Sequence, residues 1–420
     1  MGALVLGAVG GSAPIWAQST NDIPLRGIQL RFGLGLRAEA QSNRTLDPVN
    51  SDSSTELAAD LSFGLLSETP QDRLALNLAG SLRALDGEGA ANLDNGFSDP
   101  RVDLNYTRSA IDSRLSLNAE ARKTDLGDRD SLFFDETTGL FTIVNGTATL
   151  RRESFSAAYD WGLGGPFELG VVARFSRSEY SDGSATGIGG STLNDNERRT
   201  LSASARLALT EALSLDTTLS YSAFEEDGTP GTRDTVALYN SLVLGRPGGN
   251  VSFSFGVTDT EEGQRYSANV GRSLEMPFGT LSGQLGATRG VDGDTSLTGG
   301  LSASYALPSG TVTANLSRSV SSGSEQDNEQ VNTSLRLGYS QALTPVSNIG
   351  FAIDFADATV SSTGLGTTSG NFSATYTRDL TPDWDMDLGY RYRHRSQSTG
   401  PSAKSNEVFL NLRRDFLTRF

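Results

Sequence analysis

The chain of 420 residues contains one histidine and no cysteine, so few side chains could serve as nucleophiles, proton-transfer groups or metal ligands. Without a thiol there can be no thiolate nucleophile, no disulfide and no cysteine-ligated zinc. His394, in the segment RYRHRS, is the only imidazole that a Ser-His or Asp-His pair could use. It shares its parity with Tyr390 and Tyr392, on the apolar face of a predicted strand. We interpret His394 as an interfacial residue and expect no enzymatic activity.

Carboxylates are the other groups that could do chemistry. Two carboxylate pairs, Glu225 with Glu226 and Glu261 with Glu262, lie in predicted acidic loops. We interpret them as solvated loop residues without a catalytic role. These loops lack the Asp-x-Asp-x-Asp-Gly register of a calcium loop, and no Gly-x-Ser-x-Gly elbow joins a strand to a helix. The formal net charge of −16 disfavours binding to nucleic acid phosphates. We therefore expect no metal, no cofactor and no nucleic acid partner.

The remaining charged residues recur in segments that alternate apolar and polar positions. In GIQLRFGLGLRAEA, Ile28, Phe32 and Leu36 share one parity, and Arg31 and Arg37 share the other. Side chains on a strand alternate between two faces, so one face is apolar and the opposite face is polar or charged. The same pattern returns in TELAADLSFGLL, RLALNLAGSLRAL, TSLTGGLSASYAL and WDMDLGYRYR, whereas helical periodicity is absent over comparable lengths. No run of 18 apolar residues occurs, which excludes an ordinary transmembrane helix.

Charges on the polar faces indicate a water-filled interior. A charged side chain that faces lipid at mid-depth in a barrel costs about 2–4 kcal/mol, whereas an aqueous lumen hydrates it. Such charges could select among solutes as rings of fixed charge, or they could form an interior salt-bridge network that fills or stiffens a barrel. The candidate pore-lining residues are Arg31, Arg83, Arg174, Arg336 and Arg391, all expected near mid-strand, together with Asp60, Asp103, Asp216 and Asp354.

Counting the alternating segments predicts about 20 strands, within a range of about 18–22. Short Pro- or Gly-containing connections such as TPQD and LPSG alternate with longer, often acidic ones such as SNRTLDPVNSDSS. This alternation is typical of an all-β, transmembrane, up-and-down antiparallel β-barrel with a turn side and a loop side. A soluble β-sandwich would also alternate, and a β-solenoid adhesin is a second rival, but connection lengths vary too much for a fixed repeat. Tyrosines precede the short turns and predict an aromatic girdle at the inner interface: Tyr106, Tyr159, Tyr305, Tyr339 and Tyr376.

A barrel of this size should enclose an aqueous channel unless a segment folds into it. The longest connection, residues 124–146, mixes apolar LFF and LFTIV with an acidic turn and the hairpin signal Asn145-Gly146. It either packs into the lumen or extends the wall above the membrane as a hairpin, and the pattern favours the extended hairpin.

The two ends of the chain carry export and assembly signals. Residues 1–17 are typical of the second half of a secretory signal peptide, which leaves residues 18–420 as a single outer-membrane β-barrel domain; an apolar N-terminal strand or a disordered tag is the alternative. The ending VFLNLRRDFLTRF alternates up to a terminal phenylalanine, as expected of a last strand that must pair with the first. Phe416 and Phe420 are the two candidates for the signal that the barrel-assembly machinery recognises.

The opening GIQLRFGLGLRAEAQSN, the segment SDSSTELAADLSFGL and the closing SNEVFLNLRRDF resemble a family of proteobacterial outer-membrane β-barrel porins, some encoded beside exopolysaccharide-biosynthesis genes. The resemblance covers nearly the whole mature chain. It implies a channel in the outer membrane of a Gram-negative bacterium that passes small hydrophilic solutes or polysaccharide. The alternative is a non-conducting structural or adhesive barrel that presents acidic loops. Outer-membrane lipid, lipopolysaccharide and the barrel-assembly machinery are the other expected partners.

Overall fold

The computed structural model describes residues 27–49, 51–87, 95–126, 132–135, 140–143, 148–181, 194–228, 231–322, 329–361, 363–398 and 400–420. Over these residues, twenty antiparallel strands form one sheet and two further strands form a separate hairpin. The described residues contain no helix that could span a membrane. The strands of the large sheet are β1 (Gly27–Ser42), β2 (Ser53–Glu68), β3 (Asp72–Asp86), β4 (Gly96–Ser109), β5 (Ser113–Asp125), β8 (Thr149–Trp161), β9 (Phe167–Ser181), β10 (Asn196–Ala208), β11 (Leu213–Glu226), β12 (Arg233–Arg246), β13 (Gly249–Thr260), β14 (Gly263–Met276), β15 (Gly279–Arg289), β16 (Thr295–Leu307), β17 (Gly310–Ser322), β18 (Glu329–Thr344), β19 (Ser347–Val360), β20 (Gly366–Thr381), β21 (Trp384–Gln397) and β22 (Ala403–Arg419).

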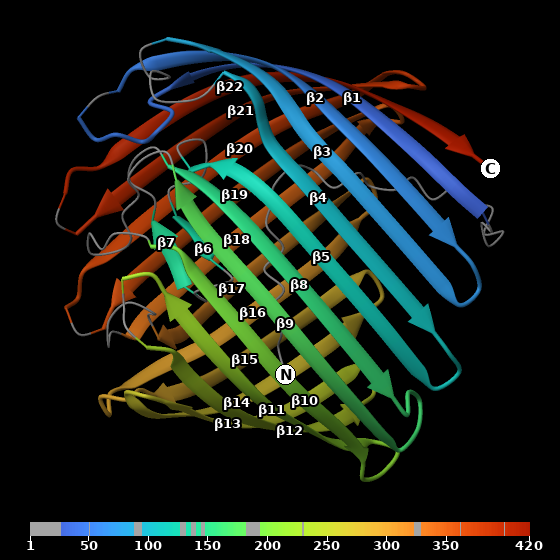
Figure 1. Ribbon diagram of the computed structural model, residues 1–420, viewed down its shortest axis with the longest axis vertical. Helices are drawn as coiled ribbons and strands as arrows, with labels where there is room; N and C mark the ends of the chain where they lie inside the picture. The colour runs from blue at the N-terminus through green and yellow to red at the C-terminus, as the bar shows by residue number, and fades with distance from the viewer. Residues whose placement is uncertain are drawn as a thin grey trace.

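The sheet closes because its last strand pairs with its first. β22 runs antiparallel to β1 from Arg419 opposite Gln29 to Asn406 opposite Ser42. The backbone N–H of Phe420 adds a bond of 2.9 Å to the carbonyl oxygen of Ile28. Figure 1 shows the two strands side by side at the top of the barrel, one blue and one red. Closure leaves no unpaired edge, which is the condition for a sheet to cross a bilayer, so the predicted up-and-down β-barrel is confirmed.

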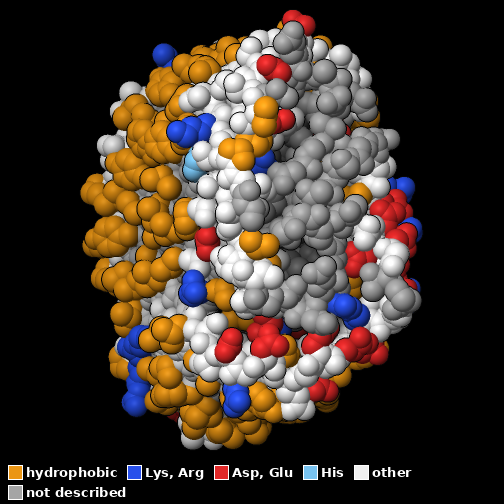
Figure 2. Space-filling view, turned by 90° about the vertical axis from the view of Figure 1, so that its left-hand side faces the viewer, with side chains coloured by type: hydrophobic (Ala, Val, Ile, Leu, Met, Phe, Trp, Pro, Cys, Tyr) orange, Lys and Arg blue, Asp and Glu red, His pale blue; other side chains and the backbone are white. Residues whose placement is uncertain are grey.

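The apolar side chains lie on the outside of the barrel. On β1, Ile28, Phe32 and Leu36 are 46–48% exposed, and on β13 Phe253 and Phe255 are about half exposed. Figure 2 shows apolar side chains over much of the wall on the left of that view and acidic side chains along the lower and right-hand rim. Directly opposite residues of paired strands share a face, so the alternate, polar parity lines the inside of each strand.

Tyrosine hydroxyls mark both edges of the apolar band. Tyr106 donates to Asp72 over 2.7 Å near the turn side, and Tyr221 donates to Asp234 over 2.8 Å near the loop side. In each case the acceptor lies closer to its own end of the barrel than the ring does. An amphipathic ring at the bilayer interface behaves in this way, with its body in lipid and its hydroxyl toward water. The described residues therefore carry a loop-side counterpart of the girdle that was predicted for the turn side alone.

The connections at the two ends differ as predicted, with one exception. On the turn side, β12 and β13 are joined by Pro247 and Gly248 alone, and the adjoining Gly249 adopts φ 136°. A Cβ there would lie 2.1 Å from the carbonyl oxygen of Ser273, so only glycine fits. On the loop side most connections are longer, but β13 and β14 are joined by residues 261–262 alone. The loop-side wall is therefore low at this part of the barrel.

The hairpin in the longest connection does not extend the wall. β6 (Leu132–Asp135) pairs only with β7 (Leu140–Ile143), and Cα atoms of β6 come within 8 Å of β20. β20 lies on a different part of the barrel from β5 and β8, which flank this connection, so the hairpin lies across the opening (Figure 1). The favoured prediction of an extended hairpin is wrong, because β6 and β7 form a separate sheet that approaches β20 and does not continue β5 and β8 upward. Asn145, Gly146 and the expected signal at residues 1–17 lie outside the described residues.

Candidate functional site

The inner wall of the barrel consists of two unlike parts. Over the described residues of β13 to β17, the inward positions hold mainly hydroxyl, amide and glycine residues, and the charges among them are Arg265 at the loop-side end of β14 and Glu275 at its turn-side end. Cross-strand hydroxyl pairs such as Ser317 with Ser334, at 2.7 Å, continue this surface onto β18. We name the inner faces of β13 to β17 the neutral wall. The charged residues gather on the rest of the circumference, which we name the charged wall.

All nine predicted pore-lining residues lie on the charged wall, and eight of them contact a polar partner. Arg31 bonds Asp415 at 2.5 Å, and Arg336 Nε bonds Asp354 Oδ1 at 2.7 Å. The other pairs are Arg83 with Asp125, Arg391 with Glu407 at 3.2 Å, Asp103 with Arg101 at 2.7 Å, Asp216 with Arg206 at 3.7 Å, and Asp60 with the hydroxyl of Ser81 at 2.5 Å. Most of the lumenal charge is therefore compensated locally, as in the network alternative.

Arg174 is the exception. It is exposed in the middle of β9, opposite Ser156 on β8 and Thr200 on β10, and it makes no ion pair within the described residues. Two other arginines lie away from mid-strand, against expectation. Arg31 is four residues from the turn-side start of β1, and Arg83 is three residues from the loop-side end of β3. The strands extend beyond the alternating segments from which their centres were judged.

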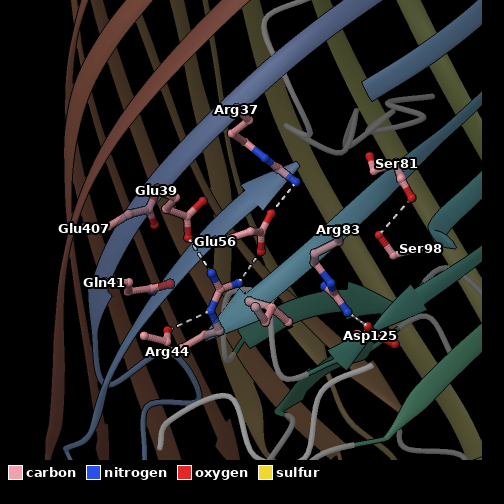
Figure 3. A network of polar contacts seen from close by, with 12 residues as sticks. Arg37, Glu39, Gln41, Arg44, Glu56, Ser81, Arg83, Ser98, Asp125 and Glu407 are labelled. Atoms are coloured by element: carbon pink, nitrogen blue, oxygen red, sulfur yellow. Dashed lines mark hydrogen bonds and ion pairs between the residues drawn. The ribbon is translucent and has the colours of Figure 1, made fainter. Parts of the chain in front are cut away.

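A buried ion-pair cluster lies at the loop side of the charged wall, where the β1–β2 connection folds inward (Figure 3). Arg44 Nη1 lies 2.9 Å from Glu56 Oε2, and Arg44 Nη2 lies 3.0 Å from Glu39 Oε1. Arg37 approaches the other oxygen of Glu56 at 2.7 Å. The side chains of Arg44 and Glu56 are only 3% and 2% exposed, so their charges depend on each other for compensation. We name Arg37, Glu39, Arg44 and Glu56 the Arg44 cluster.

Two arginines of β21 fasten the same connection to the wall. Arg393 Nη2 donates to the carbonyl oxygen of Arg44 over 2.8 Å, and Arg395 Nη2 donates to that of Leu46 over 2.5 Å. Leu46 is buried and adopts φ 53°, a left-handed conformation that a leucine holds only when its surroundings impose it. Sequence reasoning missed Arg44 and Arg395. The alternating arginines at 391, 393 and 395 were the available signal, because they share one face of one strand.

A second polar contact spans the low part of the loop-side wall. The pairing between β16 and β17 ends at Arg318 on the loop side. In this region Glu329, at the start of β18, accepts a hydrogen bond from Arg265 Nε over 2.9 Å and another from the backbone N–H of Val291 over 3.3 Å. Any Cβ at Gly290 would lie 1.8 Å from the Glu329 carboxylate. A polar cavity of about 360 Å³ lies beside Glu329, lined also by Thr288, Asp292, Asp294 and Ser296. In the described residues, no group of three or more His, Asp or Glu side chains is placed to hold a metal ion.

The comparisons with known proteins agree on the fold. No family model and no curated protein sequence matches this chain. Three solved structures cover 93–94% of it at low identity, and each is named as a receptor or a transporter. The ferric enterobactin receptor PfeA of Pseudomonas aeruginosa, in complex with enterobactin, is 11% identical with a TM-score of 0.51, over 93% of this chain and 82% of that one. The FrpB iron transporter of Neisseria meningitidis is 8% identical with a TM-score of 0.51, over 93% and 82%. The siderophore receptor PirA of Pseudomonas aeruginosa is 11% identical with a TM-score of 0.50, over 94% and 81%.

The chain is an outer-membrane β-barrel. At these identities the likeness concerns the fold alone, and the apolar outer face, the closed sheet and the polar interior of this barrel agree with it. The outer membrane of a Gram-negative bacterium is the location that this fold and this outer surface fit, as the sequence predicts.

Proposed function

We propose that this barrel is a passive channel for small hydrophilic solutes. The observation that carries the proposal is the inner wall, which carries polar side chains on every barrel strand and leaves Arg174 exposed at mid-depth. A charge at that depth requires water beside it. The comparison proteins named as receptors and a transporter support transport across the outer membrane as the general class. The barrel has no catalytic role in this proposal.

A link to exopolysaccharide export rests on the resemblance to the porin family alone. Export of a polymer would need a periplasmic partner, and the turn side offers little docking surface, since β12–β13 and β16–β17 are joined by two residues each. Small solutes are therefore the better-supported substrate class. Insertion by the barrel-assembly machinery and contact with outer-membrane lipid and lipopolysaccharide belong to the same proposal.

A non-conducting structural or adhesive barrel is the rival function. The local pairing of lumenal charges and the position of the β6–β7 hairpin across the opening favour it. Solute-size exclusion in liposomes separates the two: a channel admits small sugars such as arabinose and excludes large oligosaccharides. If liposomes that hold correctly folded protein swell no faster than empty ones in every sugar, the channel proposal is wrong.

Removing the hairpin should widen the channel. The N–H of Leu126 already donates to the carbonyl oxygen of Ala148 over 2.8 Å, so residues 127–147 can be replaced by a two-residue Asn-Gly turn without moving β5 or β8. We expect faster uptake of sugars and a larger size limit for this variant, because the hairpin lies toward β20. As a matched control, shortening the β21–β22 connection at residues 398–402 should leave the size limit unchanged. An unaltered limit in the hairpin variant would show that the hairpin does not narrow the path.

Ion selectivity should respond to Arg174. We expect Arg174→Glu to shift the reversal potential in a salt gradient toward cation preference without loss of stability, since its neighbours Ser156 and Thr200 are neutral. Arg336→Glu should shift selectivity in the same direction but also destabilise the barrel, because the new carboxylate would face Asp354. Arg318→Glu makes the same change of charge on the outer face and serves as the control. Equal reversal potentials for Arg174→Glu and Arg318→Glu would contradict a solvated path beside Arg174.

A further inference from the structure

Four adjacent strands carry a row of basic side chains on the outer face of the barrel, close to the loop side. β5 pairs with β8, β8 with β9 and β9 with β10, and the front wall in Figure 1 contains β5, β8 and β9 side by side. Lys123 on β5 lies opposite Arg151 on β8, and Arg177 and Arg199 follow on β9 and β10. We name Lys123, Arg151, Arg177 and Arg199 the basic row.

The basic row belongs to the outer, lipid-facing parity. Arg151 shares its parity on β8 with the exposed Phe155, and Arg199 shares its parity on β10 with the exposed Leu201. The pairings of these strands continue without a register shift. The guanidinium groups therefore project away from the lumen and take no part in the proposed path for solutes.

The basic row lies at the height of the outer lipid headgroups. Arg151 is ten residues from the exposed Trp161 at the turn-side end of β8, and the same interval separates Arg177 from Phe167. Ten residues of strand span roughly 33 Å, and a tilt of about 40° reduces this to about 25 Å along the membrane normal. That is about the height of the apolar band of an outer-membrane barrel, so the row marks its outer edge.

The arginines of the row remain open to a ligand although each has an acidic neighbour. Arg177 Nη2 bonds Glu179 at 2.7 Å, and Arg199 Nη2 bonds Glu197 at 2.5 Å. Arg151 bonds Glu153 through Nη2, and its Nη1 lies 3.7 Å from Glu179. The side chains of Arg151, Arg177 and Arg199 nevertheless stay 61%, 48% and 61% exposed. A guanidinium has five N–H donors, so one or two carboxylates leave donors for a further anion, and phosphate fits their planar fork. Four basic against three acidic side chains give this patch excess positive charge.

The basic row is local, and an apolar surface continues below it. On the next strands, β11 to β13, the outward residues near the loop side are acidic: Glu225, Asp234 and Asp259. On the strands of the row, Phe155, Val171 and Leu201 are about half exposed beneath the cations. A ligand that fits this surface carries phosphate at the headgroup level and acyl chains below it.

We propose that the basic row binds the phosphate groups of a lipopolysaccharide molecule in the outer leaflet, with acyl chains of that molecule against Phe155, Val171 and Leu201. The contacts are direct ones from guanidinium and ammonium donors. The proposed contacts do not include a bridging divalent cation, and the test below therefore contains EDTA. The site does not depend on whether the lumen conducts.

The test is titration of purified lipopolysaccharide into the full-length, folded protein in detergent, with EDTA present. The triple variant Arg151→Gln/Arg177→Gln/Arg199→Gln should bind at least about tenfold more weakly, because hydrogen bonds to charged groups contribute on the order of tenfold each. The matched control is Arg289→Gln/Arg318→Gln/Lys404→Gln, which removes three outward cations from other strands and should bind as the parent protein does. Lipopolysaccharide stripped of its phosphates should bind the parent and the triple variant equally.

Three results would overturn the proposal: equal binding by the triple variant and the parent, equal weakening by the control variant, or loss of parental binding in EDTA. Resistance of the folded barrel to SDS before heating serves as the folding check. If the triple variant does not fold, the single variants Arg199→Gln and Lys404→Gln replace the two triples. Arg199→Gln must then bind more weakly than Lys404→Gln, and the reverse order or equality would refute the site.

Discussion

Deletion of residues 417–420 should prevent formation of a stable barrel. In the closed sheet, Leu417, Thr418 and Arg419 lie opposite Arg31, Leu30 and Gln29, and Phe420 exchanges backbone hydrogen bonds with Ile28 at 2.9 and 3.3 Å. Without them the first residues of β1 lose their partners on one side at the membrane edge. Backbone groups left unpaired in lipid cost several kcal/mol each, which is comparable with the whole stability of an ordinary protein. The measurement is the fraction of heat-modifiable, SDS-resistant protein in the outer membrane.

Point variants separate strand pairing from recognition by the assembly machinery. Phe416→Ala and Phe420→Ala both keep the backbone of β22, so a defect in either one concerns the side chain. Phe416 lies opposite Phe32 on the lipid-facing parity, whereas Phe420 is largely exposed at the end of the strand. The segment LTRF is therefore part of the closing strand and not an extension beyond it. Normal insertion of the deletion variant would contradict this role and leave Phe416 as the candidate signal.

Glu56→Gln should destabilise the barrel by about 3 kcal/mol, toward the lower end of the cost of breaking a buried ion pair. Glu56 compensates both Arg37 and Arg44, and the buried Arg44 also contacts Glu39. The substitution keeps the shape of the side chain and removes its charge. The measurement is urea-induced unfolding of the barrel in lipid vesicles, followed by tryptophan fluorescence.

The control for Glu56→Gln is Asp103→Asn, which removes a lumenal carboxylate from a partly exposed pair with Arg101. Exposed pairs contribute about 0–1 kcal/mol, so this variant should unfold close to the parent protein. Equal unfolding free energies for the two variants would show that burial of the Arg44 cluster does not matter. In that case the β1–β2 connection is held mainly by Arg393 and Arg395.

The sequence predicts the architecture well because each strand repeats the same two-residue alternation. Leu30, Phe32 and Leu34 suffice to assign one face of β1 to lipid, and the predicted count of about 20 strands matches the sheet. For the candidate site, the sequence predicts which side chains face the lumen but not which of them contact each other. Parity places Arg336 and Asp354 inward, but their contact depends on the register between β18 and β19, which alternation does not encode.

Contacts made by connections were beyond sequence reasoning. Arg44 lies two residues beyond the end of β1, and nothing in the sequence indicates that its side chain turns into the lumen to meet Glu56. The sequence is compatible with two directions for the β6–β7 hairpin, either into the lumen or upward as an extension of the wall. The division into a neutral and a charged wall could have been read from the strands, since the segments between residues 249 and 322 carry few charges on their polar parity.

Single-channel recording in planar lipid bilayers tests the central claim, that the lumen is an aqueous path, most directly. Purified full-length protein should give stepwise conductance increments with weak ion selectivity, because the predicted pore-lining charges are paired apart from Arg174 and Asp60, and Asp60 contacts a hydroxyl. The variant that lacks residues 127–147 should give larger increments under the same conditions. Protein that is folded and inserted, yet gives no conductance in either form, would contradict the claim and favour a structural or adhesive barrel.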